Sequence, residues 1–197
     1  MLILSLSFHE AAHAWAANRL GDPTARQLGR LTLNPLAHID WIGTVVFPLI
    51  AFLSGVPLIG WAKPVPVDAR NLQHPRRDFA LVALAGPVSN LILAAVASIA
   101  FITLLSPDTL VTVAGHTLYL AVALNVMLAV FNLIPVPPLD GGNVLMGVVP
   151  IGAARAISAI RPYGFVIIYG LMLTGLISRL LDPVNRFVGN FLLSFLL

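Results

Sequence analysis

Apolar residues run along the chain in long blocks, and short intervening stretches carry most of the charged residues. A block of about 20 apolar residues is long enough for a helix to cross the hydrocarbon core of a membrane. The predicted helical segments lie approximately at residues 2–20, 41–60, 79–105, 117–134 and 163–181, with a shorter one at 187–197. We therefore expect an all-α, multi-pass helical bundle of about five to six membrane segments.

Two stretches between these segments predict breaks in helix. Residues 60–67, Gly-Trp-Ala-Lys-Pro-Val-Pro-Val, alternate in character and contain two prolines, which is typical of an extended, edge-like strand. Residues 132–142, Asn-Leu-Ile-Pro-Val-Pro-Pro-Leu-Asp-Gly-Gly, follow the fourth segment. Their prolines must end that helix, and the two glycines permit a tight turn.

The composition excludes an ordinary soluble domain. The chain has 197 residues, of which 58% are hydrophobic and 10% charged, and its mean hydropathy is +0.94. This length suits one membrane domain over residues 1–197, with a motif-bearing core at about 1–150 and C-terminal helices at about 160–197. Residues 1–20 lack a basic start, so we expect them to be retained rather than cleaved as a signal peptide.

Charge and cysteine content narrow the chemistry further. The net charge is +3, but the basic residues stand singly or in pairs in the loops, which favours membrane orientation over nucleic-acid binding. The sequence contains no cysteine, which excludes disulfides and thiolate metal ligands.

The first apolar segment contains the sequence His9-Glu10-Ala11-Ala12-His13. Residues four apart lie on one face of a helix, so both imidazoles can direct a ring nitrogen at one ion. Imidazoles suit Zn²⁺, and a hydrolytic zinc site keeps one position open for water, whose proton Glu10 would accept. Ionisable groups inside a membrane segment are costly and usually functional, so we predict metal binding rather than chance placement.

A zinc ion held by two histidines needs a third protein ligand. The candidates in the chain are Asp22, Asp40, Asp68, Asp78, Asp108, Asp140, Asp182, His38, His74 and His116. Asp140 is the strongest, because irregular backbone at membrane depth is tolerated only where it lines a cavity. The alternative is that Asp140 belongs to an ordinary Asp-Gly turn at the end of a helix.

Three motifs occur in order along the chain: HEAAH at 9–13, GPVSN at 86–90 and NLIPVPPLDGG at 132–142. Together they resemble the site-2 protease family of intramembrane zinc metalloproteases, peptidase family M50. The stretches at 34–40 and 60–67 resemble the small branch of that family that lacks a PDZ domain.

This resemblance implies a core of three transmembrane helices that carry the motifs. It implies that His9, His13 and Asp140 ligate one zinc ion and that Glu10 is the general base. It also favours Asn132 as a residue that positions the substrate backbone or the oxyanion.

The shared metal site constrains the path of the chain through the membrane. Asp140 can meet the histidines only if the chain crosses an even number of times between them, and the segments at 79–105 and 117–134 already supply two crossings. Either 41–60 or 60–67 must then be re-entrant, as the glycines and prolines there suggest. Nine of the eleven basic residues would then lie on the same side of the membrane as the zinc site, and only Arg179 and Arg186 on the opposite side. Because basic residues concentrate on the cytoplasmic side, we expect the zinc site to face the cytoplasm from a cell membrane.

Other polar residues in or near the apolar segments have simpler expected roles. Asn125 and Asn132 share a helix face, and hydrogen bonding between helices is the plain alternative for both. Gly86-Pro87 is expected to loosen its helix and let another backbone approach, while Asn90 bonds a neighbouring helix or the active-site region. We interpret two further residues, His38 and Asp40, as loop anchors.

The sequence thus predicts an intramembrane zinc endopeptidase that cleaves a transmembrane segment of another membrane protein within the lipid bilayer. Two alternatives belong to other classes. One is a proteolytically inactive membrane scaffold, against which the intact Glu10 argues. The other is a membrane metal transporter, which would need ionisable groups spaced along a pathway rather than gathered at one depth.

Overall fold

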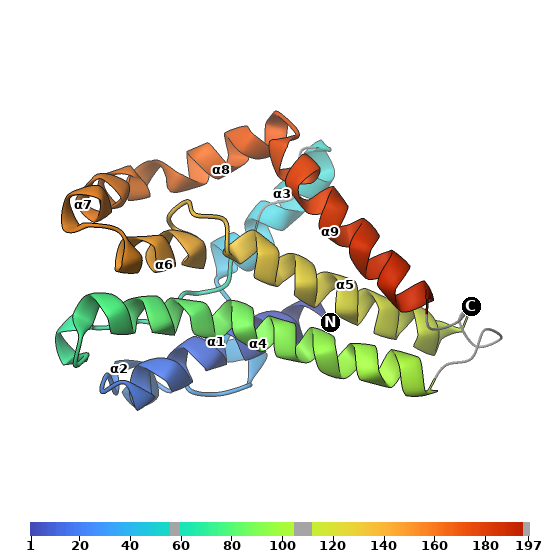
Figure 1. The fold of residues 1–197 in the computed structure, drawn as a ribbon, viewed down its shortest axis with the longest axis horizontal. Helices are drawn as coiled ribbons and strands as arrows, with labels where there is room; N and C mark the ends of the chain where they lie inside the picture. Colours follow the sequence, from blue (N-terminus) through green and yellow to red (C-terminus); the bar gives the residue numbers. More distant parts are fainter. Residues whose placement is uncertain (56–59, 105–111, 195–197) are drawn as a thin grey trace.

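The computed structural model describes residues 1–55, 60–104 and 112–194, and within these ranges the chain forms helices and irregular segments without a β-strand (Figure 1). The α-helices are α1 (Leu2–Arg19), α2 (Thr24–Gln27), α3 (Phe47–Ser54), α4 (Pro75–Leu104), α5 (Val113–Asn132), α6 (Asp140–Val148), α7 (Ile151–Ile160), α8 (Gly164–Leu173) and α9 (Leu176–Leu193). Shorter helical turns are η1 (Pro35–His38), the π-helical η2 (Trp41–Val46), η3 (Ala69–Asn71) and η5 (Arg161–Tyr163).

Helix α4 is the centre of the molecule and packs against α1, α5 and α6 (Figure 1). The face of α1 that meets it is made of small and polar residues, among them Ala14, Ala17 and the two motif histidines. Small residues let helices approach closely in a membrane, where apolar bulk gives no driving force for association. The close packing of α1 on α4 therefore places the motif of α1 directly against α4.

Three helical stretches in the described residues are long and apolar enough to cross a membrane: Pro75–Leu104, Val113–Asn132 and Ile151–Leu173, the last comprising α7 to α8. The chain is a multi-helix membrane protein on this evidence. The number of membrane segments predicted from the sequence, about five to six, is larger than the three that meet this length and hydropathy standard.

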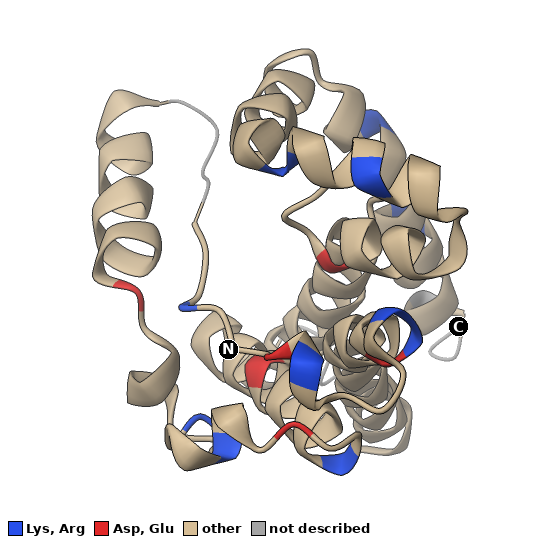
Figure 2. Ribbon diagram, turned by 90° about the vertical axis from the view of Figure 1, so that its left-hand side faces the viewer, with Lys and Arg blue, Asp and Glu red and all other residues tan. Residues whose placement is uncertain are grey.

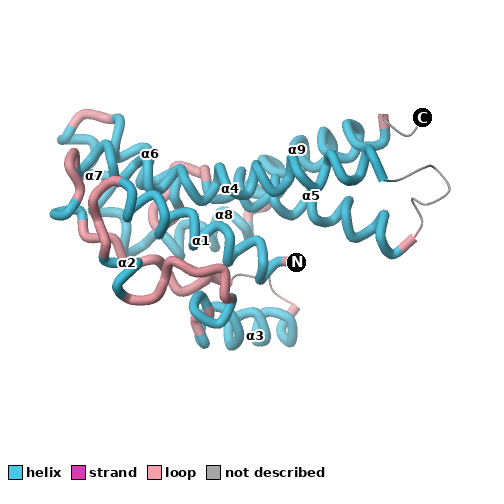
Figure 3. Tube along the Cα trace, turned by 90° about the horizontal axis from the view of Figure 1, so that it is seen from below, coloured by secondary structure: helices cyan, strands magenta, loops and turns pink. Residues whose placement is uncertain are grey.

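The helical stretch at 41–54 is too short to cross a membrane as a regular helix. Trp41–Ser54 would be about 21 Å long as a regular helix, which is short of the roughly 30 Å hydrocarbon core. Gly55 ends α3 with a φ of +67°, and the chain returns so that the Trp61 amide donates to the Gly43 carbonyl at 3.1 Å. Figure 2 and Figure 3 show α3 standing apart from the other helices.

Residues 60–67 are not helical, as predicted, but they form no strand. The amides at alternate positions 61, 63 and 65 donate, which is the period of an extended chain, but their acceptors are the carbonyls of Gly43 in η2 and His38 in η1 and the Glu10 carboxylate. No neighbouring strand accepts these bonds within the described residues. We call residues 60–68 the extended segment.

The C-terminal segments also differ from the prediction. The expected helix at 163–181 is interrupted at Gly175, whose φ of +71° ends α8 and begins α9. Helix α9 then continues through Pro183, across the gap expected between 181 and 187, because its apolar face packs in a core cluster with α4 and α5. That cluster contains Ala94, Phe101, Val122, Val188 and Leu192. Residues 195–197 of the last predicted segment lie outside the described residues.

Candidate metal centre

Three side chains from two distant parts of the chain converge between α1, α4 and α6. His9 and His13 lie one turn apart on α1, and Asp140 is the first residue of α6. The Asp140 Oδ2 atom is 3.1 Å from His9 Nε2 and 3.4 Å from His13 Nε2. One potential ligand atom from each residue lies within 4.8 Å of the others.

The chemistry of this cluster fits a metal ion. Asp140 Oδ2 is buried and has no hydrogen-bond donor in the described part of the chain, although buried carboxylate oxygens are normally satisfied. The two imidazoles direct their Nε2 atoms at this oxygen while their Nδ1 atoms bond elsewhere. Two imidazole nitrogens and one carboxylate oxygen are a donor set that suits zinc and leaves a position for water.

Helix α4 supplies the hydrogen bonds that orient the two imidazoles. His9 Nδ1 is 2.6 Å from Asn90 Oδ1, and His13 Nδ1 is 2.7 Å from the Val82 carbonyl oxygen. Pro87 lies between them in the helix and removes one helical hydrogen bond, which loosens the backbone there. A ring N–H bonded in this way fixes the tautomer and directs the other nitrogen outward.

Gly86 leaves the space in which the two imidazoles meet. A Cβ at this position would lie 2.5 Å from His9 Nε2 and 2.4 Å from His13 Nε2, which is closer than real contacts allow. The Gly86-Pro87 pair thus permits a close approach as predicted, but the approaching groups are two side chains rather than a backbone.

A compact turn returns the chain from the end of α5 to Asp140. The helix ends at Asn132, and the backbone then closes on itself through bonds such as Leu139 amide to Val136 carbonyl at 3.0 Å. Gly141 packs against this turn so closely that a Cβ would lie 2.2 Å from the Leu133 carbonyl oxygen. Glycine is required there because any side chain would push Asp140 away from the imidazoles.

The predicted residues share one cavity of about 1060 Å³. His9, Glu10, His13, Asp140 and Asn132 all line it. Apolar residues form much of the remaining wall, among them Leu124, Met127, Leu128, Phe131, Ile168 and Met172.

Two of these residues already have local partners. Glu10 is half-buried and its Oε2 accepts the Val65 amide at 3.2 Å, so the extended segment lies directly beside it. The buried Arg30 holds the same segment by donating to the carbonyls of Lys63 and Pro64. The Asn132 amide donates to the Leu128 carbonyl of its own helix at 3.0 Å.

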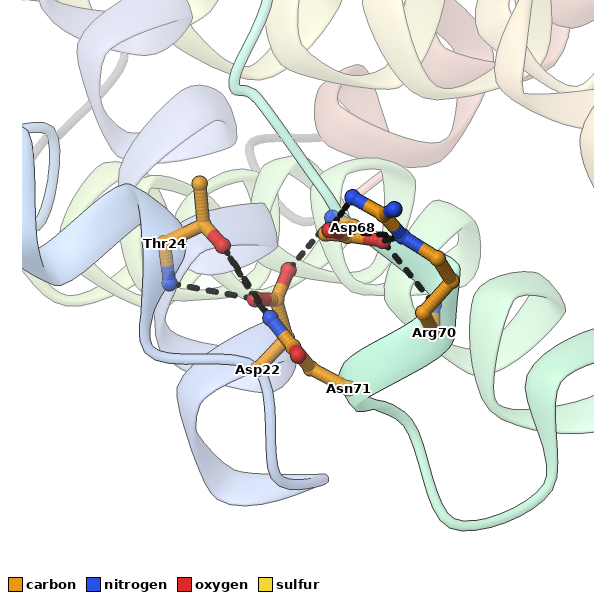
Figure 4. Close-up of polar contacts among 5 residues, drawn as sticks. All are labelled: Asp22, Thr24, Asp68, Arg70 and Asn71. Atoms are coloured by element: carbon orange, nitrogen blue, oxygen red, sulfur yellow. Dashed lines mark hydrogen bonds and ion pairs between the residues drawn. The ribbon is translucent and has the colours of Figure 1, made fainter.

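A buried carboxylate outside the cavity fastens the far end of the extended segment (Figure 4). Asp22 is fully buried, and one of its oxygens accepts the Asp68 amide at 2.7 Å. The other accepts the Thr24 amide and hydroxyl and the Asn71 side-chain amide. We call these bonds the Asp22 latch. Asp22 is thus a structural anchor rather than a metal ligand, and the sequence Asp-Pro-Thr is a pattern in which Asp bonds the backbone two residues on.

Hydrogen bonds determine the ionisation of two carboxylates in this loop region, Asp22 and Asp68. Burial by itself would raise the pKa of Asp22, but bonds from Asn71, Thr24 and the Asp68 amide outweigh it and lower this pKa. Hydrogen bonds from Arg70 hold the pKa of Asp68 at about 2. Both carboxylates are therefore ionised at neutral pH.

The remaining alternative ligands do not join the cluster. His38 Nε2 donates to the Thr32 carbonyl oxygen at 2.8 Å, and the Asp40 carboxylate accepts the Gly43 amide at 2.8 Å at the start of η2. Both residues anchor loops, as predicted. His9, His13 and Asp140 form the one metal-type cluster among the described residues, and Asp108 lies outside them.

Long apolar helices around a cluster of metal-ligand type define a membrane protein with a candidate metal centre. Comparisons with known proteins identify the family of this membrane protein. Residues 102–174 match the sequence profile of Peptidase family M50. YwhC of Bacillus subtilis, named for an expected zinc metalloprotease activity, is 38% identical over 188 residues, which cover 93% of this chain and 83% of YwhC. The chain belongs to peptidase family M50.

Two mycobacterial relatives carry the same kind of name. Rip2 of Mycolicibacterium smegmatis is 32% identical over 178 residues, and Rip2 of Mycobacterium tuberculosis H37Rv is 34% identical over 172 residues. These alignments cover 90% and 87% of this chain but 66% and 64% of the two Rip2 proteins. No solved structure matches the chain. Family membership supports a metalloprotease role.

Proposed function

We propose that this protein is an intramembrane zinc endopeptidase that hydrolyses a peptide bond in or beside a transmembrane segment of another membrane protein. The observation that carries the proposal is the convergence of His9, His13 and Asp140 at the wall of a cavity among apolar helices. In this proposal the three residues hold one zinc ion, and the cavity opens toward the cytoplasmic side of a cell membrane.

The chain's own residues perform the proton transfers. When bound, zinc would polarise the substrate carbonyl and lower the pKa of a water molecule toward about 7. Glu10 lies next to His9 and accepts the proton of that water, then delivers it to the amine that leaves. Asn132 lines the same cavity and positions the substrate backbone or the oxyanion with its side-chain amide.

The extended segment is the part of the wall against which an unwound substrate would lie. Alternate amides of this segment are already bonded to the protein, and Pro64 and Pro66 have no N–H. Because Arg30 bonds the Pro64 carbonyl, the opposite edge retains the Ala62 amide and the carbonyl oxygens of Ala62 and Pro66. A substrate would therefore pair with this edge mainly through hydrogen bonds from its own amides to these carbonyl oxygens.

Replacing the proposed base tests the mechanism. Glu10→Gln should keep about one zinc per chain and abolish cleavage of a model transmembrane peptide, because an amide cannot accept the water's proton while both imidazoles remain. Zinc content and cleavage are measured on the same detergent-purified sample. Cleavage near the wild-type rate would contradict the role of Glu10, and a wild-type chain that binds zinc without cleaving would favour a scaffold.

Replacing the proposed third ligand tests the metal centre separately. Asp140→Ala should lower zinc occupancy together with activity, because two protein ligands remain. The matched control is Asp40→Ala, which removes a loop carboxylate that lies outside the cluster and should leave zinc occupancy unchanged. Full zinc content in Asp140→Ala would place the third ligand elsewhere.

A further inference from the structure

A chain of buried amides runs from the candidate metal centre into α5. Asn90 Oδ1 contacts His9 Nδ1, and the Asn90 amide donates to Asn125 Oδ1 at 2.9 Å. The Asn125 amide in turn donates to the Ala121 carbonyl at 2.8 Å. Asn90 is 0% exposed and Asn125 4%, so water does not substitute for these partners.

This chain has one consistent direction of hydrogen bonding. The Ala121 carbonyl can only accept, so Asn125 must direct its NH₂ group to it and its oxygen to Asn90. Asn90 must then direct its own NH₂ group to Asn125 and its oxygen to His9. The Ser5 carbonyl, 3.4 Å from Asn90 Nδ2, requires the same orientation.

The direction of these hydrogen bonds determines the tautomer of His9. An amide oxygen can only accept, so His9 Nδ1 must carry a proton and its Nε2 keeps a lone pair for the cluster. His13 needs no such relay, because its Nδ1 meets the Val82 carbonyl directly.

We propose that Asn125 is a positioning residue for the metal centre: by orienting the Asn90 amide, it holds His9 in the tautomer that binds metal. This inference rests on the metal site of the proposed function, but Asn125 lies two hydrogen bonds away from that site. Without Asn125 only the longer contact with the Ser5 carbonyl, at 3.4 Å, still holds the Asn90 NH₂ group, so the Asn90 amide can turn over and present NH₂ to His9, which favours the wrong tautomer.

The first test compares two polar residues on one helix. Asn125→Leu should lower zinc affinity about tenfold or more, the size of effect expected when a ligand loses its supporting bond. Thr117→Val is the control, since its hydroxyl also bonds the carbonyl four residues earlier but does not line the cavity. Affinity is measured on the purified protein by competition with a chromophoric zinc chelator, independently of cleavage.

The second test separates orientation from packing. Asn90→Asp places two equivalent acceptor oxygens beside His9 Nδ1, so the direction set by Asn125 no longer matters. In that background Asn125→Leu should change zinc affinity by less than about twofold. A persistent tenfold loss there would assign the effect to packing and overturn the inference.

The remaining outcomes are distinct. Equal zinc affinity in Asn125→Leu and Thr117→Val would overturn the inference while the metal centre stands. A wild-type chain that binds no zinc would overturn the metal centre itself, and the inference with it.

Discussion

At the scale of single residues, the candidate site depends on a glycine, Gly86, which has no side chain. Gly86 faces both imidazoles, and the missing Cβ leaves the space that their Nε2 atoms occupy. A methyl group there cannot be accommodated by a small shift, because the rings are also held by Asn90 and the Val82 carbonyl. The ligand geometry is thus set as much by this glycine as by the ligands.

We expect Gly86→Ala to lower zinc affinity at least about tenfold, because both imidazoles must move away from Asp140. Gly170→Ala in α8 is the matched control, since a Cβ at that position meets no atom within 4 Å. Chelator competition on the two purified variants measures the difference. Equal affinities would mean that the rings can rearrange around the methyl group.

At the scale of structural elements, the extended segment is held at both ends and in the middle. Trp61 bonds Gly43 at one end, the Asp22 latch holds Asp68 at the other, and Val65 bonds Glu10 between them. Trp61 also packs between Phe47 of α3 and Phe165 of α8, with ring centroids 5.1 and 5.0 Å away. This segment therefore has a defined position beside the proposed base without belonging to a sheet.

Asp22→Asn should loosen the extended segment while leaving zinc content unchanged. One oxygen becomes an NH₂ group that must face an existing donor, and a lost hydrogen bond of about 1 kcal/mol corresponds to a roughly fivefold rise in amide exchange at Val65 and Asp68. Hydrogen exchange read by mass spectrometry measures this, with exposed Asp182→Asn as the control. Unchanged exchange in residues 60–68 would show that the latch does not hold them.

At the scale of the whole molecule, the metal centre and the path of the chain depend on each other. In the proposed membrane arrangement α4 and α5 cross away from the cluster and back, so residues 41–67 make no net crossing between α1 and α6. The short π-helical and α-helical arm at 41–54, and the return of Trp61 to Gly43, agree with this arrangement.

Single cysteines test this path directly, because the native chain contains none. Cysteines at Arg26, Arg76 and Arg155 should react with an impermeant thiol reagent from the cytoplasmic side, and one at Val113 from the opposite side. Val113 begins α5 and is exposed, so its reactivity reports the far end of the bundle. If positions 26 and 76 reacted from opposite sides, residues 41–67 would cross the membrane, and the shared metal centre would be untenable.

The sequence by itself determined the local features of this protein. Apolar block length predicted membrane helices, and the four-residue spacing of His9 and His13 put both on one face of α1, because helix geometry depends only on neighbouring residues. The prolines and glycines at 132–142 likewise predicted the turn that brings Asp140 back. These inferences need no knowledge of what packs against each element.

Only the tertiary structure decided the features that join distant segments. The bonds of Asn90 and Val82 to the imidazoles, the space left by Gly86 and the Asp22 latch link residues that lie tens of positions apart. Alternation at 60–67 suggested a strand, but no partner strand packs beside it in the described residues, and its amides bond the carbonyls of Gly43 and His38 and the Glu10 carboxylate instead. An alternating sequence pattern predicts an extended backbone, whereas the segment that pairs with this backbone depends on the packing of the whole chain.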